Sequence, residues 1–411
     1  MTSRLSSGSG GEKRQTCETP GAEGAQMLMA SVGWFGRFSV CARMTSTDVF
    51  LSGDVMTGRG IDQIMRHPSD PVIHERWAQS AVDYVELAEQ RNGPIPRGVD
   101  PEYVWGDALE TLDEQGVDVG IINLETAVTD DGEPWPGKGI HYRMHPSNLD
   151  VIGAARVDCC VLANNHVLDW SYPGLTQTLA TLREAGLSTA GAGSDLVSAT
   201  RASVIENPGG ARVLVVAVGM GSSGIPFSWA AAEDRPGVAY VDSPSDRAAD
   251  SVVERVATVA KPGDLVVSSI HWGPNWGYEV PRSHRRFAHR LVDSGRVHIV
   301  HGHSSHHPLG IEVYRGRPIL YGCGDLINDY EGIEGYEEFH PDLGILYLAS
   351  MDSVAGTLSG LQLVPMRMRR FSLERAPSDD VMWLEETLDR ESRPWGTHVE
   401  VTGDSRLRVI W

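Results

Sequence analysis

The sequence predicts an α/β protein in which strands and helices form separate layers. Short runs rich in Val, Ile and Leu alternate along the chain with amphipathic stretches, which is typical of layered α/β folds. Most of the short runs are apolar on both faces, as strands covered by other layers on each side tend to be. The composition, with 41% apolar and 22% charged residues among 411, is that of an ordinary folded globular protein.

The segment 1–46 differs from the rest of the chain. It is rich in Ser, Gly, Thr and Glu and shows no hydrophobic period, so we expect a disordered tail. The remainder contains no internal repeat and no long linker. We therefore expect a single domain over residues 47–411.

Six β-rich runs are expected to be strands, because each is bounded by polar or Gly-rich turn residues. They are "DVFLSGD" (48–54), "VGIINLE" (119–125), "DCCVLANNH" (158–166), "RVLVVAVG" (212–219), "DLVVSSIHWG" (264–273) and "VHIVHGH" (297–303).

Amphipathic stretches between these runs are expected to be helices. They span residues 75–91, 106–115, 146–154, 173–185, 244–260 and 281–294. The segment "IEVYRGRPILYG" (311–322) is expected to form a hairpin around Arg315-Gly316, since Gly favours tight turns. Further strands are expected near 344–350 and 359–365.

The charge and the cysteines restrict the class of partner and the compartment. The 35 basic and 55 acidic residues give a net charge of −20, which argues against nucleic acid and anionic membrane surfaces as partners. No run reaches the roughly 18–20 apolar residues of a membrane span. The five cysteines are odd in number and show no C-x-x-C spacing, so we expect them to be reduced. These observations favour a cytoplasmic protein.

Five of the predicted strands end in side chains that ligate metals or move protons. Because strand-end loops form the binding crevice of open α/β sheets, we expect these side chains to converge. They are Asp54 in "SGDVMTGR", Asn123 and Glu125 in "INLET", Asn164, Asn165 and His166 in "ANNHVLDW", His271 in "IHWGPNW", and His301, His303, His306 and His307 in "HGHSSHH".

Single members of this set also have purely structural interpretations. Asp54 follows a glycine, as in many turns, and a lone histidine such as His271 is commonly a hydrogen-bonded core residue. The four clustered histidines are harder to explain this way, because neutral imidazoles bury poorly without partners. Carboxylate, amide and imidazole donors together suit one or two divalent ions such as Mn, Fe, Zn or Mg, and a metal site of this kind makes a hydrolase plausible.

Five motifs taken in order resemble one protein family. "GDVMTGR", "NLET", "NNHVLDW", "IHWGPNW" and "GHSSHHPLGIEVYRGRPILYGCGDLIND" resemble the CapA-type proteins of capsule and poly-γ-glutamate synthesis, a branch of the calcineurin-like metallophosphatase superfamily. The similarity covers residues 48–350. It implies a four-layer α/β/β/α sandwich of the metallophosphatase type, with a two-metal site at the strand ends.

The resemblance also implies roles for individual residues. Glu125 would stand where the superfamily usually has a bridging aspartate. His166 would be the general acid that protonates the leaving group, with Asp169 orienting it and Glu125 completing the catalytic set. The implied metal ligands are Asp54, Glu125, Asn165, His271, His303 and His306.

Four residues are implied to contact substrate. Arg59 and Arg143 could grip a carboxylate or phosphate, although either arginine could instead form a structural ion pair. Trp272 and Tyr278, with Trp276 between them, could line the pocket or simply pack.

The sequence departs from the family pattern at two places. Met56 stands where superfamily phosphatases carry a histidine two residues after the first aspartate. The last histidines are spaced His-Ser-Ser-His instead of His-x-His, which leaves open whether His301, His306 or His307 completes the ligand set with His303.

Three functions are compatible with these features. The first is a metal-dependent hydrolase that cleaves a phosphoester or an amide such as a γ-glutamyl bond with metal-activated water and a His general acid. The second is a lyase, dehydratase or cyclase of small-molecule biosynthesis that uses the same His and carboxylate groups. The third is a non-catalytic module that holds a polyanionic chain, which the charge of −20 opposes. The expected partner is a small molecule or a short polymer.

Overall fold

A computed structural model describes residues 46–207 and 210–411, all within one of the two compact units into which the chain divides. The predicted tail lies outside the described residues except for Ser46, which already belongs to the first strand.

The larger sheet contains ten strands among the described residues. Its central strands β1 (Ser46–Val55), β2 (Val119–Leu124), β5 (Cys159–Val161) and β6 (Ser188–Ala190) run parallel, and β17 (Leu343–Asp352) pairs antiparallel with β1. In spatial order the strands are β20 (His398–Val401), β21 (Leu407–Ile410), β18 (Thr357–Arg369), β17 (Leu343–Asp352), β1 (Ser46–Val55), β2 (Val119–Leu124), β5 (Cys159–Val161) and β6 (Ser188–Ala190), with β16 (Asp325–Ile327) beside β1 and β19 (Ser372–Arg375) beside β18.

The smaller sheet contains seven strands in the described part of the chain, and its centre is also parallel. The order is β11 (Tyr240–Val241), β9 (Arg212–Met220), β12 (Leu265–His271), β13 (Ile299–His303), β15 (Arg317–Leu320) and β14 (Ile311–Tyr314), with β8 (Ser203–Glu206) beside β9. Two short ladders pair β10 (Gly237–Val238) with β7 (Ala192–Gly193), and β3 (Ala127–Val128) with β4 (Arg143–Met144).

The α-helices described are α2 (Val82–Asn92), α3 (Asp107–Gln115), α4 (Asp150–Ala154), α5 (Ser171–Glu184), α6 (Leu196–Thr200), α7 (Asp246–Ala257), α8 (Arg282–Asp293) and α9 (Ser378–Ser392). Short 3-10 helices are η1 (Asp62–Ile64), η2 (Pro146–Asn148), η3 (Gly221–Ser223), η4 (Phe227–Trp229), η5 (Glu337–Phe339) and η6 (Arg393–Trp395).

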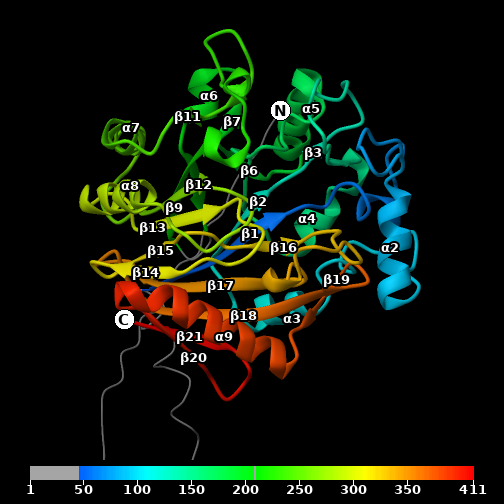
Figure 1. Cartoon of the computed structure of the whole chain (residues 1–411). Helices are drawn as coiled ribbons and strands as arrows, with labels where there is room; N and C mark the ends of the chain where they lie inside the picture. The colour runs from blue at the N-terminus through cyan, green and yellow to red at the C-terminus, as the bar shows by residue number, and fades with distance from the viewer. Residues whose placement is uncertain (1–45, 208–209) are drawn as a thin grey trace, which may run out of the picture. The chain divides into compact units, whose positions relative to one another are not determined.

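The two sheets share a core, and helices cover their outer sides. Successive residues of β9 point to opposite faces, as the strand period requires. Val213 and Val215 belong to a core cluster that includes residues of β1, whereas Leu214 and Val216 pack with α7 and α8. Figure 1 shows α7 and α8 on the outer side of the smaller sheet, and α2 past the strand ends, while α3 contacts β19 of the larger sheet. The predicted α/β class and the four-layer α/β/β/α order are confirmed.

Several predicted elements are shorter than expected, most clearly the helix 75–91 and the strand 158–166. The predicted helix 75–91 begins only at Val82, because the preceding residues form a loop closed by a bridge between Val72 and Ser80. The predicted strand 158–166 ends at Val161, and the chain then turns into the site.

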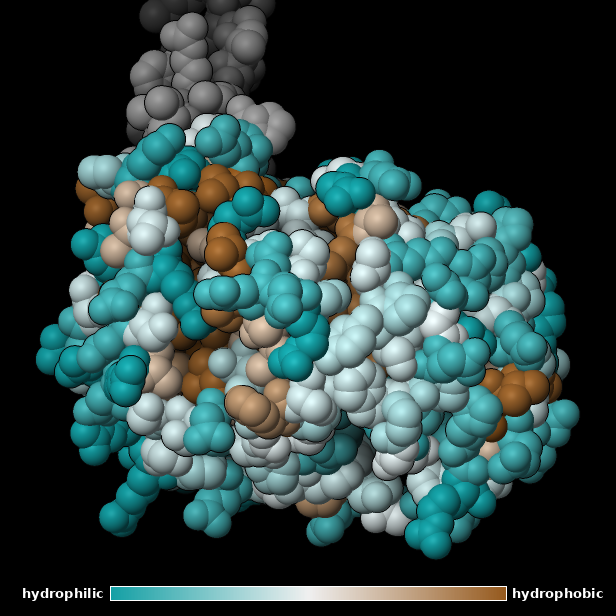
Figure 2. All heavy atoms as spheres, turned by 90° about the horizontal axis from the view of Figure 1, so that it is seen from above, coloured by the Kyte–Doolittle hydropathy of each residue, from teal (hydrophilic) through white to brown (hydrophobic). Residues whose placement is uncertain are grey.

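The cysteines and the helices bear on two further expectations. Cys159, Cys160 and Cys323 are buried free thiols, while Cys17 and Cys41 lie outside the described residues. No helix in the described ranges combines the length and apolarity needed to cross a bilayer. The face seen in Figure 2 is largely hydrophilic, with apolar side chains gathered in separate patches.

Candidate metal centre

Most of the site residues come from the carboxyl ends of parallel strands in the two sheets, whereas Asp325 is the first residue of β16. His271 pairs with His303 at the last residues of β12 and β13. Asp54 pairs with Asp325 where β1 meets β16, and β2 runs beside β1 and leads into Glu125. Because parallel strands end at the same edge of a sheet, the fold gathers residues that are far apart in the sequence.

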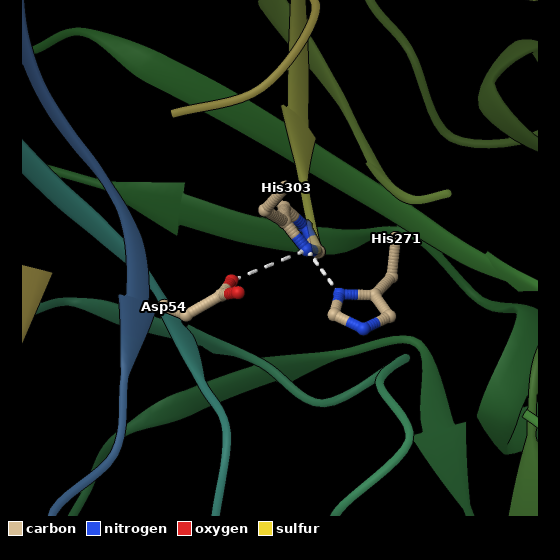
Figure 3. Close-up of side chains that lie close together, drawn as sticks. All are labelled: Asp54, His271 and His303. Atoms are coloured by element: carbon tan, nitrogen blue, oxygen red, sulfur yellow. Dashed lines mark hydrogen bonds and ion pairs between the residues drawn. The ribbon is translucent and has the colours of Figure 1, made fainter. Parts of the chain in front are cut away.

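Asp54, His271 and His303 form the first of two described groups that could hold a metal ion. One ligand atom from each lies within 4.8 Å of the others, and all three side chains are buried. Nδ1 of His303 lies 4.0 Å from Oδ1 of Asp54 and 2.8 Å from Nδ1 of His271. Figure 3 shows the three side chains converging from different strands.

Asp54, His306 and Asp325 form the second group, again with one ligand atom of each within 4.8 Å of the others. Nδ1 of His306 lies 2.8 Å from Oδ1 of Asp325. Asp54 is the residue common to both groups. Asp325 was not predicted, although it lies in the quoted segment "GCGDLIND", directly after the predicted hairpin.

The polar atoms of these groups fit a divalent cation. Oδ2 of Asp54 is buried and has no hydrogen-bond partner among the described residues. Burial, and then the charge of Asp325, raise the pKa of Asp54 to about 7. Burial lowers the pKa values of His271 and His303 well below the ordinary range, so both offer neutral imidazole. A cation would offset the buried negative charge and accept these lone pairs.

Glu125 lies beside both groups but belongs to neither. Asn123 Nδ2 donates to Oε2 of Glu125 at 2.8 Å and to Oδ1 of Asp54 at 2.7 Å. Oε1 of Glu125 lies 3.8 Å from Nε2 of His166, and Oε2 lies 3.8 Å from Nδ1 of His271. Burial, and then the charge of Asp54, raise the pKa of Glu125 well above its usual range. The Glu125 carboxylate therefore lies between His271 of the first group and His166.

Other predicted ligands contact the histidines of the first group. Oδ1 of Asn165 lies 2.9 Å from Nε2 of His271, the nitrogen opposite the one that faces His303. Ser269 Oγ lies 2.9 Å from Nε2 of His303 and 3.0 Å from Nδ1 of His301. Ser269 thus fixes the orientation of His303. His301 contacts the other side of this hydroxyl and does not belong to the metal group.

His166 is held by a buried carboxylate and a lysine. Its Nδ1 lies 2.6 Å from Oδ2 of Asp169, which also accepts a 2.7 Å hydrogen bond from the Tyr142 backbone N–H. Lys138 donates to Asp169, and its Nζ lies 2.9 Å from the same Nδ1. Burial lowers the pKa of His166 to about 4. Although burial raises the pKa of Asp169, His166 and Lys138 bring it below its usual value.

The pair is thus a neutral imidazole oriented by an ionised carboxylate. Lys138 was not predicted, because a single lysine in the loop segment "PGKGIH" carries no periodic or motif signal.

The two predicted substrate arginines are already engaged within the protein. Arg59 is 4% exposed, and its guanidinium donates to Asp329 at 2.8 Å and to Glu75 at 3.0 Å. The guanidinium of Arg143 lies 3.4 Å from the ring centroid of Trp170. For Arg59, the structural ion pair is the interpretation that the contacts support.

The aromatic residues after β12 take different places. Trp272 is 3% exposed, stacks on His284 at 4.6 Å and packs beneath α8, so it belongs to the core. Tyr278 is half-buried, with its ring 4.6 Å from that of His307. Trp276 lies beside the second metal group, 5.3 Å from the ring of its histidine.

The fold and the site together define an α/β/β/α protein with a buried centre of histidines and carboxylates at its strand ends. The family model for the bacterial capsule synthesis protein PGA_cap matches residues 48–330. The chain belongs to this family.

Its relatives agree with the CapA-type resemblance. A probable polyglutamine synthesis accessory protein of Mycobacterium tuberculosis is 48% identical over 363 residues, which are 88% of this chain and 95% of the relative. PGA biosynthesis protein CapA of Bacillus subtilis is 27% identical over 309 residues, 74% of this chain and 70% of the relative. A solved structure described as a novel phosphatase of Mycoplasma pneumoniae matches 81% of this chain and 96% of its own, with 11% identity and a TM-score of 0.45.

Proposed function

We propose that this protein is a metal-dependent hydrolase of capsule or polyglutamate synthesis that acts on a phosphoester or on an amide such as a γ-glutamyl bond. The observation that carries the proposal is the sharing of Asp54 by two buried groups of metal-binding side chains, next to the paired His166 and Asp169. Membership in the PGA_cap family and the names of the relatives support the polymer context.

The side chains divide into those that hold cations and those that move a proton. Bound divalent ions such as Mn, Fe, Zn or Mg would supply Lewis acidity and lower the pKa of water. Two groups of side chains that share Asp54 would hold these ions. One group adds His271 and His303, and the other adds His306 and Asp325.

Proton transfer to the leaving group is the role of His166. Its Nδ1 faces Asp169, which leaves Nε2 to meet the substrate. Because a neutral imidazole that donates from Nδ1 has no proton on Nε2, the proton delivered there is first accepted, either from water or from the Glu125 carboxyl 3.8 Å away. Lys138 holds Asp169 in place for this step.

The test combines metal removal with isotopically labelled water. The purified protein is assayed on aryl phosphate and on γ-glutamyl anilide, before and after treatment with a chelator, and its metal content is measured. We expect turnover to require the metal and the label to enter the acid product. Full turnover by metal-free protein would contradict the proposal.

A lyase or dehydratase is the second candidate, favoured by Met56. The side chain of Met56 is fully buried and its sulfur accepts a 3.9 Å contact from the Tyr330 hydroxyl, so it offers a soft thioether where the superfamily carries an imidazole ligand. An elimination incorporates no label from water into its product, and the same experiment therefore separates the two candidates.

A further inference from the structure

A pocket of about 430 Å³ lies beside the second metal group, with His306 in its wall. This volume is in the range of small-molecule sites. Its lining is mainly apolar, and five aromatic side chains contribute to it: Trp77, Tyr84, Trp276, Tyr330 and Tyr336. Asn275 adds an amide at the same wall.

Contacts between the aromatic side chains hold the walls of the pocket in place. Trp276 stacks on Tyr336, with ring centroids 4.2 Å apart and planes 13° apart. Trp77 donates from its indole nitrogen to the Tyr84 hydroxyl at 2.9 Å, yet 69% of its surface is exposed. A large apolar ring that is held in place but left uncovered is available to a ligand.

The basic side chains of the pocket wall are already paired with carboxylates of the protein. Arg59 is in the wall, but it is paired with both Asp329 and Glu75. The Tyr84 ring covers one face of its guanidinium at 3.6 Å. Glu334 adds a further carboxylate to the lining. His306, also in the wall, faces Asp325 at 2.8 Å. The side chains of the lining therefore offer a chain of carboxylates no basic group that is not already paired within the protein.

We propose that this pocket binds an uncharged, flat-faced ring of the substrate, stacked against Trp77 and Trp276, with the reacting group directed toward His306. The inference rests on the proposed function only for the direction of the reacting group. A base or a sugar ring both present the apolar face that aromatic side chains recognise. A glutamate polymer carries no ring that could stack on Trp77 and Trp276, so the ring would belong to another part of the substrate or to a carrier.

Calorimetric titration of the full-length protein tests the inference without catalysis. Adenosine and methyl β-glucoside are the ring probes, and a γ-linked triglutamate is the anionic probe. Each is titrated into the protein before and after chelator treatment. Trp77→Ala is the main variant because the side chain is exposed and its removal leaves the core intact, and Trp276→Leu is the second. Trp411→Ala, which removes a 47% exposed tryptophan outside the pocket, is the matched control.

We expect one ring probe to bind in both conditions and to lose about tenfold in affinity in Trp77→Ala and in Trp276→Leu, the equivalent of roughly 1.4 kcal/mol of stacking. The Trp411→Ala control should bind as the unaltered protein does. Which probe binds distinguishes a base from a sugar. The inference is overturned if neither ring probe binds, or if the triglutamate binds and Trp77→Ala weakens it. Because binding is measured on chelated protein, an absence of hydrolysis would leave this result unchanged.

Discussion

At the scale of single residues, Asp54 carries the largest share of the site's chemistry. It is the carboxylate common to both metal groups, and one of its oxygens is buried without a hydrogen-bond partner in the described part of the chain. Burial of such a group is costly in the absence of a cation. Replacing the Asp54 carboxylate should therefore weaken metal binding but should not destabilise the metal-free protein.

Asp54→Asn is expected to weaken metal binding at both positions, on the order of 100-fold, whereas Asp325→Asn should weaken it at one. Metal-free Asp54→Asn should melt at or above the temperature of the metal-free unaltered protein, because a buried charge has been removed. Metal content and melting temperature with and without metal check both effects. Asp100→Asn, at a carboxylate that is 73% exposed, is the control. Retention of full metal content by Asp54→Asn would refute the bridging role.

His166→Gln separates proton transfer from metal binding. The imidazole lies outside both metal groups, so metal content should stay unchanged while turnover falls about 10²-fold, the usual effect of losing a general acid. Turnover and metal analysis of the same preparation check this. Loss of metal in this variant would mean that His166 is a ligand.

Lys138→Met tests a positioning role. The ammonium group contacts Asp169 and lowers the pKa of His166, after the larger effect of burial. Without it that pKa should rise, so activity that needs protonated His166 should persist to higher pH. The pH profile of kcat/KM distinguishes this shift from a simple loss of folded protein, which would scale the profile without moving it.

At the scale of elements, the sequence predicted strands that are long enough to show a hydrophobic pattern, and it missed a strand that is too short to show one. The apolar runs 48–54 and 264–273 became β1 and β12, and the residues at their ends, Asp54 and His271, were found with them. β16 has three residues, too few for any pattern, and Asp325 was missed with it. Its position is fixed by pairing with β1, a contact between distant segments that local patterns cannot reveal.

Gly53→Ala tests how closely β1 and β16 must approach. A Cβ at this position would lie 1.7 Å from the carbonyl oxygen of Gly324, the same oxygen that accepts from the Asp54 backbone N–H at 2.9 Å. We expect a loss of about 1–3 kcal/mol or more in the free energy of unfolding, together with reduced metal content, because Asp54 and Asp325 would move apart. Chemical denaturation measures the first effect. Gly139→Ala, where nothing lies within 4 Å, should change neither quantity.

At the scale of the whole molecule, burial of neutral histidines makes stability depend on pH. Burial lowers the pKa values of His284, His298, His301 and His307 to about 4. In the unfolded chain these side chains titrate near 6.5. Between these two values each of these histidines binds more protons in the unfolded state, so their contribution to the free energy of unfolding falls as the pH is lowered from about 6.5 toward 4.

His284 is the histidine best suited to a test, because burial alone lowers its pKa and it lies against Trp272 instead of the metal groups. His284→Phe keeps the stacked ring but cannot titrate. It should reduce the slope of unfolding free energy against pH by up to one proton, about 1.4 kcal/mol per pH unit, in this window. Denaturant unfolding at several pH values measures the slope, and carboxylates common to both proteins cancel in the comparison. His67→Phe, the same substitution at an exposed position, is the control. An equal slope for His284→Phe would show that His284 becomes protonated in the folded protein as readily as in the unfolded chain.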